Sequence, residues 1–364
     1  MALSTSQQID PRTHVRVGKE RVENVAGTAF PGHHPGESNH WDLDQFNRNL
    51  RVTLNSLSPS TLEFDLVGVD ASVANALRRI VISEVPTVAI ETVYVWNNTS
   101  IVQDEVLAQR LGLIPLAIDP RKLQLKQCTP SPNAPARRSR VADRFVGTLA
   151  PEDAPTDLNT VVFNLIARCE RRKDVKKGEL DPAKIYTGAD VLSSQIEFDP
   201  KGSQAESFAQ NPPRAAVGGI LLAKMRGGQE IVAELHCNKG IGKEHAKWSP
   251  VATASYRLLP AISVLGDIPP SLQPKFQACF PPGVIDISSG KVVVANARAD
   301  TVSREVLRHS EFEGKVELGR VRDHFIFSIE SAGQYSPEEL VPEAIGVLLA
   351  KIREVRKCLR AYVG

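Results

Sequence analysis

The sequence predicts an α+β protein, because two amphipathic helices near opposite ends of the chain each follow segments that alternate like β-strands. In residues 50–66, apolar and polar side chains alternate on both sides of a turn that contains serine and proline, which predicts a β-hairpin with one buried face. A second alternating segment, 325–329, precedes the long helix at the end of the sequence. We therefore expect an antiparallel sheet and two packed helices, with further strands and loops between them.

The first helix is predicted over residues 70–84. Asp70 can accept hydrogen bonds from free N–H groups of the first turn, and Pro86 prevents the helix from continuing. Arg78 and Arg79 lie at the edge of its apolar stripe. The pattern alone favours an ordinary core helix, although the same stripe suits docking against a partner. The stripe comprises Val73, Ala76, Leu77, Ile80 and Val81.

The C-terminal helix is predicted to begin after Ser336, which forms a capping box with Glu339. Pro342 lacks the N–H that would bond to the carbonyl of Glu338, so we expect a bent first turn or a regular helix that restarts there. One face is too apolar to stand free in water, and it must cover a sheet, another chain or both. The principal stripe comprises Leu340, Ala344, Leu348, Ile352, Val355 and Leu359.

Composition argues against several classes of protein. The 364-residue chain is 42% hydrophobic and 24% charged, which is typical of a soluble globular protein with two domains. A formal net charge of +2 gives no global field to attract DNA or an anionic membrane. We expect no membrane span and no secretory signal. The five cysteines are scattered without close pairs, which argues against a zinc site and favours a reducing, intracellular setting.

Three polar regions lack a regular period. Residues 1–40 are rich in turn residues and are interpreted as an N-terminal arm, whose histidines we expect to be solvated. Residues 119–157 form a long proline-rich loop with an arginine cluster, and a second basic cluster covers 168–177. These loops leave a nucleic-acid-binding module open as an alternative function. No aromatic residues interleave with the basic ones, so solvated loops or contacts to an acidic protein surface are the simpler interpretation.

No catalytic constellation is recognisable in the sequence. Residues 240–243, Gly-Ile-Gly-Lys, lack the spacing of a phosphate-binding loop, and Glu244 would repel a phosphate. Glu244 and His245 could form an acid–base pair on a loop, but no nucleophile or metal-ligand group accompanies them. We therefore expect no catalytic residue, no cofactor and no bound metal, and an enzyme is the weakest hypothesis.

Four segments, in this order along the chain, resemble the larger α-like subunit of multisubunit RNA polymerases. The similarity spans about residues 48 to 360 and is greatest with the eukaryotic type shared by RNA polymerases I and III. Polymerase II and some archaeal relatives carry cysteine clusters that this chain lacks, which leaves residues 260–310 as a remnant of that insertion. The segments are D-A-S-V-A-N-A-L-R-R-I-V-I-S-E-V-P at 70–86, R-L-G-L-I-P-L at 110–116, K-G-I-G-K-E-H-A-K-W-S-P at 239–250 and F-S-I-E-S-A-G-Q-Y-S-P-E-E-L at 327–340.

The resemblance implies a discontinuous dimerisation domain at 41–87 and 252–364, with an inserted mixed α/β domain at 88–251. It implies a non-catalytic assembly subunit that pairs with the smaller α-like subunit. Together they would form the platform for the largest and second-largest subunits in rRNA, 5S rRNA and tRNA transcription. Small zinc-binding polymerase subunits would be further partners, and DNA would be met only through the complex. The implied location is the nucleus, including the nucleolus.

The resemblance also assigns two surfaces. The dimer interface would comprise Val73, Ala76, Leu77, Ile80, Leu348, Ile352, Val355 and Leu359. The large-subunit interface would comprise Arg78, Arg79, Gly112, Leu113, Ile114, Pro115, Lys243, Glu244, His245, Lys247 and Trp248. For Trp248, packing in the protein's own core is an equally good interpretation, and it stays open at this point.

Overall fold

The computed structural model describes residues 9–23, 25, 41–125, 155–175, 179, 181–288 and 290–363. The predicted arginine cluster at 137–144 and the histidines of the predicted arm at 33–40 lie outside these ranges. The chain divides into two compact units. Unit 1 consists of Met1–Ser56, Glu63–Ala76 and Ser255–Ser328, and unit 2 consists of Leu57–Leu62, Leu77–Ala254 and Ile329–Gly364. This division assigns the C-terminal helix to unit 2, whereas the resemblance places that helix in the dimerisation domain. The domain boundaries implied by the resemblance therefore stay a prediction.

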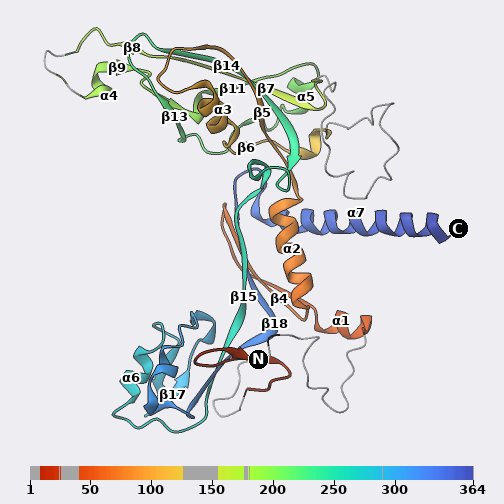
Figure 1. Ribbon diagram of the computed structural model, residues 1–364, viewed down its shortest axis with the longest axis vertical. Helices are drawn as coiled ribbons and strands as arrows, with labels where there is room; N and C mark the ends of the chain where they lie inside the picture. Colours follow the sequence, from red (N-terminus) through yellow and green to blue (C-terminus); the bar gives the residue numbers. More distant parts are fainter. Residues whose placement is uncertain are drawn as a thin grey trace. The chain divides into compact units, whose positions relative to one another are not determined.

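A six-stranded sheet runs through unit 1, with strand order β2-β1-β18-β4-β3 and β15 paired to β18. The short helix α1 (Leu43–Asn49) leads into its edge strand, and Figure 1 shows these elements. The strands are β1 (His14–Val17), β2 (Val22–Glu23), β3 (Arg51–Leu57), β4 (Thr61–Val67), β15 (Val251–Val264) and β18 (Val316–Ser331).

The structure corrects the interpretation of residues 9–23 as part of a loose arm. β1 pairs antiparallel with β18, with His14 opposite Val321, and β2 continues the sheet. Ile9, Val15 and Val17 are buried. The sequence signal was weak because β1 has only four residues, too few for a clear alternating pattern.

The predicted hairpin forms as β3 and β4, but the predicted burial of one face holds for β4 and not for β3. On β4, Leu62, Phe64 and Leu66 are buried, and Phe64 stacks on Phe327 of β18 with ring centroids 4.9 Å apart. Every residue of β3 is exposed. β3 is the last strand of the sheet, and its alternating apolar residues meet no covering element within unit 1 as described. Alternation therefore identified the strand correctly but could not distinguish a core face from an uncovered one.

The rest of unit 1 is a small subdomain with its own core, centred on Phe276 and Phe312. These two rings pack edge to face, with centroids 5.1 Å apart. The 3₁₀ turn η6 is preceded by Arg304, whose backbone lies in the left-handed region at φ 63°. The elements are α6 (Gln273–Ala278), β16 (Ile285–Ser288), β17 (Lys291–Val294), η5 (Ala297–Ala299), η6 (Glu305–Arg308) and η7 (Ser310–Phe312).

A carboxylate-centred network ties the sheet of unit 1 to this subdomain. Both carboxylate oxygens of Asp65 accept hydrogen bonds from Arg298 Nη1, at 2.8 and 2.7 Å. His324 Nε2 lies 2.9 Å from the Asp65 carboxylate, and Asn55 Nδ2 donates to it at 2.7 Å. Burial raises the pKa of Asp65, but the hydrogen bonds from Arg298 and His324 outweigh it and hold that pKa below its usual value.

Replacing Asp65 with asparagine is expected to lower the free energy of unfolding by about 2–3 kcal/mol at neutral pH, because Arg298 loses its ion pair. Since the folded pKa of Asp65 is depressed, its contribution is complete above about pH 5 and is lost as the pH falls through the folded pKa. The difference between wild type and Asp65→Asn should therefore shrink in acid. Urea unfolding at several pH values measures this. Glu63→Gln, on the exposed side of the same strand, should change stability little at any pH.

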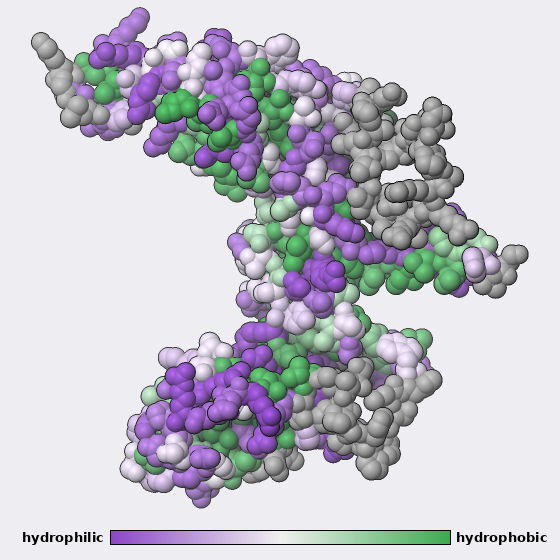
Figure 2. Space-filling view, viewed as in Figure 1, coloured by the Kyte–Doolittle hydropathy of each residue, from purple (hydrophilic) through white to green (hydrophobic). Residues whose placement is uncertain are grey.

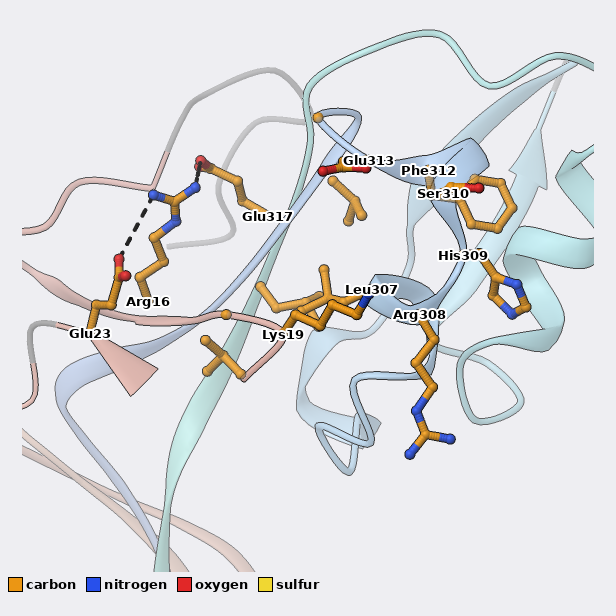
Figure 3. A pocket seen from close by; sticks show the side chains of 15 residues that line it. Arg16, Lys19, Glu23, Leu307, Arg308, His309, Ser310, Phe312, Glu313 and Glu317 are labelled. Atoms are coloured by element: carbon orange, nitrogen blue, oxygen red, sulfur yellow. Dashed lines mark ion pairs between the residues drawn. The ribbon is translucent and has the colours of Figure 1, made fainter. Parts of the chain in front are cut away.

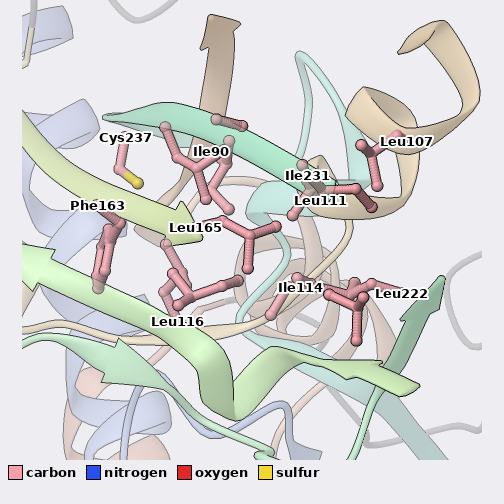
Figure 4. Close-up of a cluster of buried hydrophobic side chains, with 14 of the residues drawn as sticks. Ile90, Leu107, Leu111, Ile114, Leu116, Phe163, Leu165, Leu222, Ile231 and Cys237 are labelled. Atoms are coloured by element: carbon pink, nitrogen blue, oxygen red, sulfur yellow. The ribbon is translucent and has the colours of Figure 1, made fainter. Parts of the chain in front are cut away.

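Unit 2 contains a four-stranded sheet with strand order β11-β7-β14-β5. The helix α3 (Asp104–Gly112) packs on it, and the residues between them form a continuous apolar core, which includes Leu107, Phe163 and Leu165 (Figure 4). The four strands are β5 (Pro86–Asn98), β7 (Thr160–Arg168), β11 (Ile196–Asp199) and β14 (Glu230–Ile241).

Short elements complete this part of unit 2. Three two-stranded pairs are β6 (Leu116–Ala117) with β12 (Arg214–Ala215), β10 (Asp190–Leu192) with β13 (Leu221–Lys224), and β8 (Glu170–Arg171) with β9 (Tyr186–Thr187). The short helices and turns are α4 (Pro182–Ile185), α5 (Gln204–Ser207), η1 (Pro120–Lys122), η3 (Ser193–Gln195) and η4 (Ala246–Trp248).

The two predicted helices are present as α2 (Ala71–Ser83) and α7 (Pro337–Val363). Asp70 Oδ1 accepts the N–H of Ser72 at 2.8 Å, which confirms the predicted cap of α2. Glu339 Oε2 accepts from both the backbone N–H and the hydroxyl of Ser336, which confirms the glutamate half of the predicted capping box. α7 runs through Pro342 as one helix. None of the described helices has the length and apolar character needed to cross a lipid bilayer.

Candidate subunit interface

The second half of α7 carries an uncovered apolar stripe. Leu340 and Ala344 are fully buried, so the start of the helix is covered by the rest of the chain. Beyond them, five aliphatic residues at three- and four-residue spacings are between 43% and 59% exposed. This spacing places them on one side of the helix, and Figure 2 shows apolar residues along its length. The exposed stripe comprises Ile345, Leu349, Ile352, Val355 and Leu359.

Polar contacts within unit 2 hold α7 in place. Arg121 binds Glu339 at 3.0 Å and Glu343 at 2.9 Å. The hydroxyl of Tyr335 donates to the carbonyl of Pro86 at 2.8 Å, just before the helix starts. Farther along, the ammonium of Lys351 lies 2.8 Å from the carboxylate of Glu84, which follows α2. The helix is therefore fixed on its polar side while its apolar stripe faces outward.

The stripe of α2 is divided between packing and exposure. Ile80 and Val81 are buried, Ala76 and Leu77 are half-buried, and Val73 is exposed. Leu348 of α7 is also half-buried. The pairing of this stripe with Leu348, Ile352 and Val355 in a common dimer core stays a prediction. Arg79 is exposed, whereas Arg78 is half-buried.

The segment at 112–115 presents a single exposed apolar side chain. Gly112 is the last residue of α3, where an added Cβ would lie 3.5 Å from the carbonyl oxygen of Ile90. Ile114 is buried in the core of unit 2, and Pro115 is half-buried. Leu113 is 55% exposed. At this helix end, Gly112 and Ile114 are buried within unit 2, whereas the side chain of Leu113 is exposed to solvent.

Trp248 packs inside unit 2. Of the two interpretations left open by the sequence, this agrees with packing in the protein's own core. Its side chain is 7% exposed, and its indole N–H donates to the carbonyl of Asn238 at 3.1 Å. The hydroxyl of Thr87 donates to its carbonyl at 2.6 Å. A Cβ added at Gly240 would lie 2.5 Å from the indole ring, so glycine is required for this close approach.

Lys247 connects Trp248 to the neighbouring strand β5. Its ammonium lies 4.6 Å from the centre of the indole ring, pairs with Glu91 and donates to the carbonyl of Ile90 at 3.0 Å. Lys243, Glu244 and His245 are exposed around it. This leaves a polar surface above a tightly packed tryptophan.

Glu244 and His245 show no geometry of an acid–base pair. The Nδ1 atom of His245 accepts the backbone N–H of Lys247 at 3.1 Å and so caps the 3₁₀ turn η4. Burial, and secondarily the nearby charge of Glu91, raises the pKa of Glu244. His245 thus has a structural task that the sequence pattern did not reveal.

A hollow in unit 1 lies between β1, the start of β18 and the turns η6 and η7 (Figure 3). Arg16 dominates its polar side and pairs with Glu317 at 3.1 Å and Glu23 at 4.0 Å. Glu317 also accepts the backbone N–H of Ile9 at 3.1 Å. These contacts attach residues 9–23 to the sheet, so we assign the residues around the hollow a structural role.

The described residues give little support for a phosphate-binding or metal-binding site. Arg168 pairs with Glu230 at 2.6 Å, which reduces its availability for a phosphate. Among the residues that the structure describes, no three His, Cys, Asp or Glu side chains gather to hold a metal ion. The exposed apolar stripe of α7 is therefore the strongest candidate site, and its chemistry is that of a protein–protein interface.

Comparison with known proteins shows which family of proteins carries this stripe. The sequence model of the RNA polymerase Rpb3/Rpb11 dimerisation domain matches residues 63–352. The RPAC1 subunit of DNA-directed RNA polymerases I and III from Saccharomyces cerevisiae is 46% identical, over 94% of this chain and 98% of the yeast chain. The human RPAC1 subunit is 43% identical, over 96% of each chain. Subunit 3 of RNA polymerases II, IV and V from Arabidopsis thaliana is 33% identical, over 85% of this chain and 92% of the plant protein.

These matches cover most of this chain. They also cover nearly the whole length of the yeast and human relatives. The matched region includes all of α2 and more than half of α7, which are the two helices with apolar stripes. The chain therefore belongs to the family of RNA polymerase subunits that carry the Rpb3/Rpb11 dimerisation domain, and it resembles the subunits shared by RNA polymerases I and III over nearly its whole length.

Proposed function

We propose that this chain is a non-catalytic assembly subunit shared by DNA-directed RNA polymerases I and III. It binds the smaller α-like subunit, and the heterodimer supports the two large catalytic subunits during synthesis of rRNA, 5S rRNA and tRNA. The observation that carries the proposal is the exposed apolar stripe of α7 in a chain with a polymerase dimerisation domain. Such a stripe is costly to leave in water and is typical of an obligate interface.

The magnitude of this burial supports a permanent complex. Each aliphatic side chain of the stripe contributes roughly 1.5–3 kcal/mol when it moves fully from water into an apolar interface, and these residues are about half-exposed. Five such residues, with the half-buried Leu77 and Leu348 beside them in the proposed seam, supply a continuous apolar centre. We expect the complete interface to bury more than about 2,000 Å².

The large subunits are proposed to contact other surfaces of the chain. Arg79, Leu113 and the group Lys243, Glu244 and His245 are exposed and are offered for this role. Gly112, Ile114 and Trp248 support those residues from within unit 2. Small zinc-binding subunits are further proposed partners, and the proposed location is the nucleus, including the nucleolus.

Co-expression with the smaller α-like subunit tests the proposal. We expect a stable 1:1 complex on size-exclusion chromatography that persists at high salt, because its centre is apolar. Purification through a tag on this chain should also recover the subunit sets of both polymerase I and polymerase III. A folded monomer that ignores the smaller subunit would exclude the heterodimer, and recovery of a single polymerase would exclude the shared role.

Replacing Leu113 with aspartate is expected to leave the heterodimer intact and to weaken recruitment of the second-largest subunit about tenfold. Leu113 can lose binding with little loss of folding, since more than half of its surface is exposed. Pull-down of the second-largest subunit by the purified heterodimer measures the effect. Val106→Asp, at an exposed position of the preceding helix α3 about two turns away, serves as the control and should bind normally. Equal binding by both variants would remove Leu113 from the proposed interface.

A further inference from the structure

The sheet of unit 2 has a second face that the core does not use. In β14, Ile231, Ala233 and Leu235 point into the core, so Glu230, Val232, Glu234 and His236 point to the other side. Strand pairing extends this outer face across the sheet. Glu197, Asn164, Glu234 and Tyr94 lie opposite one another on β11, β7, β14 and β5.

Aromatic residues project from β5 at the edge of this outer face. Tyr94 is 47% exposed, and its ring packs edge to face against His236 with centroids 4.9 Å apart. Trp96 is 72% exposed and occupies a bulge, since its neighbours Val95 and Asn97 pair with successive residues of β14. On β7, Ile166 is exposed on the same side. We call Tyr94, Ile166, Glu234 and Glu197 the outer aromatic face, and Trp96 is exposed at its edge.

The charge of this face is negative. Three cations near this face are paired in the described part of the chain, Lys247 with Glu91, Arg168 with Glu230 and Lys201 with Asp199. Glu197 is exposed, and the Glu234 carboxylate lies 2.7 Å from His236 Nε2. Lys201 also lies near Glu234, but its ammonium is bound to Asp199 at 2.6 Å, so the carboxylates of Glu197 and Glu234 stay in excess. Excess carboxylates beside exposed aromatic rings form a receptor for cations.

We propose that the outer aromatic face binds an arginine- or lysine-bearing segment of another polymerase subunit. A guanidinium can stack on Tyr94 and reach the carboxylate of Glu234 or Glu197. Nucleic acid fits poorly, because base stacking needs a positive groove for the phosphates and this face is acidic. A second copy of this chain would bring two acidic faces together. The inference rests on the proposed function, which supplies the partner chain.

Site-specific cross-linking in the assembled polymerase tests this surface. Tyr94 is replaced with p-benzoylphenylalanine, which keeps an aromatic ring at the position, and the complex is purified through the smaller α-like subunit before irradiation. We expect a cross-link to a segment of another subunit that contains arginine or lysine. The charge reversal Glu234→Lys should lower the cross-link yield about tenfold, whereas Glu206→Lys on the exposed helix α5 should not change it. The same photoreactive residue at Val217 is the positional control.

The outcomes separate this inference from the proposed function. If the polymerase assembles but Tyr94 gives no cross-link to another subunit, the outer aromatic face is not a docking surface. A cross-link to DNA or RNA, or to a segment without basic residues, also overturns the inference. If the chain fails to enter the polymerase at all, the proposed function fails and this inference fails with it.

Discussion

Replacing Ile352 with aspartate is expected to abolish the complex with the smaller α-like subunit, with a loss of affinity of at least about a hundredfold. Ile352 is more than half exposed in the isolated chain and lies in the middle of the exposed stripe of α7. The substitution would place an unpaired carboxylate in the apolar centre of the interface. Binding of the purified, labelled smaller subunit, measured by titration at moderate salt, gives the change in affinity.

Ala350→Asp is the matched control for this experiment. Ala350 is exposed on α7 two residues earlier, and the helical period places it on the opposite side from the stripe. The two variants introduce the same charge into the same helix, so any general cost to helix stability is shared. Normal binding by Ala350→Asp with lost binding by Ile352→Asp assigns the stripe to the interface. Equal behaviour of the two variants would refute that assignment.

Ile352 separates binding from folding more cleanly than the stripe of α2 does. Leu77→Asp is also expected to destroy the complex, because a charge in the seam is costly there as well. Leu77 is already half-buried within the chain, however, so its substitution also removes intramolecular packing. A lost complex with Leu77→Asp therefore needs a parallel measurement of unfolding, whereas Ile352→Asp is expected to leave folding unchanged.

Local chemistry explains why the helices could be predicted well from the sequence. Asp70 caps α2 and Ser336 precedes α7, and these boundaries depend on residues within one turn of the helix end. The apolar stripe of α7 was also visible from its spacing. Whether a stripe is covered by the same chain or by another depends on distant segments. Leu340 and Ile352 share one stripe by sequence, yet the first is buried and the second is exposed.

The same limit explains the residues that the sequence placed poorly. β3 and β4 both alternate, but only β4 faces a covered core. Gly112 was grouped with surface residues, yet it lies where α3 approaches β5. The outer aromatic face was missed because Tyr94 and Glu234 are separated by 140 residues and meet only through strand pairing. An alternating pattern gives the two faces of each strand, but it does not give the register between strands.

Trp248→Ala is expected to lower the free energy of unfolding of unit 2 by about 3–5 kcal/mol, because it removes a buried indole and leaves a cavity. If Trp248 instead acted mainly at the surface, the substitution would weaken binding of a large subunit and leave stability unchanged. Urea unfolding of the full chain, followed by the fluorescence of a probe in unit 2 or by hydrogen exchange of β14, distinguishes these results.

A double-mutant cycle with Gly240 strengthens this test. Gly240→Ala alone is expected to cost about 2–3 kcal/mol, because the new methyl group would lie 2.5 Å from the indole ring and force it to move. In the Trp248→Ala background the same methyl group enters the space left by the indole, so its cost should nearly disappear. The two substitutions should therefore be strongly non-additive. Simple additivity would show that Gly240 and Trp248 do not pack together, and the assignment of Trp248 to the core of unit 2 would then be wrong.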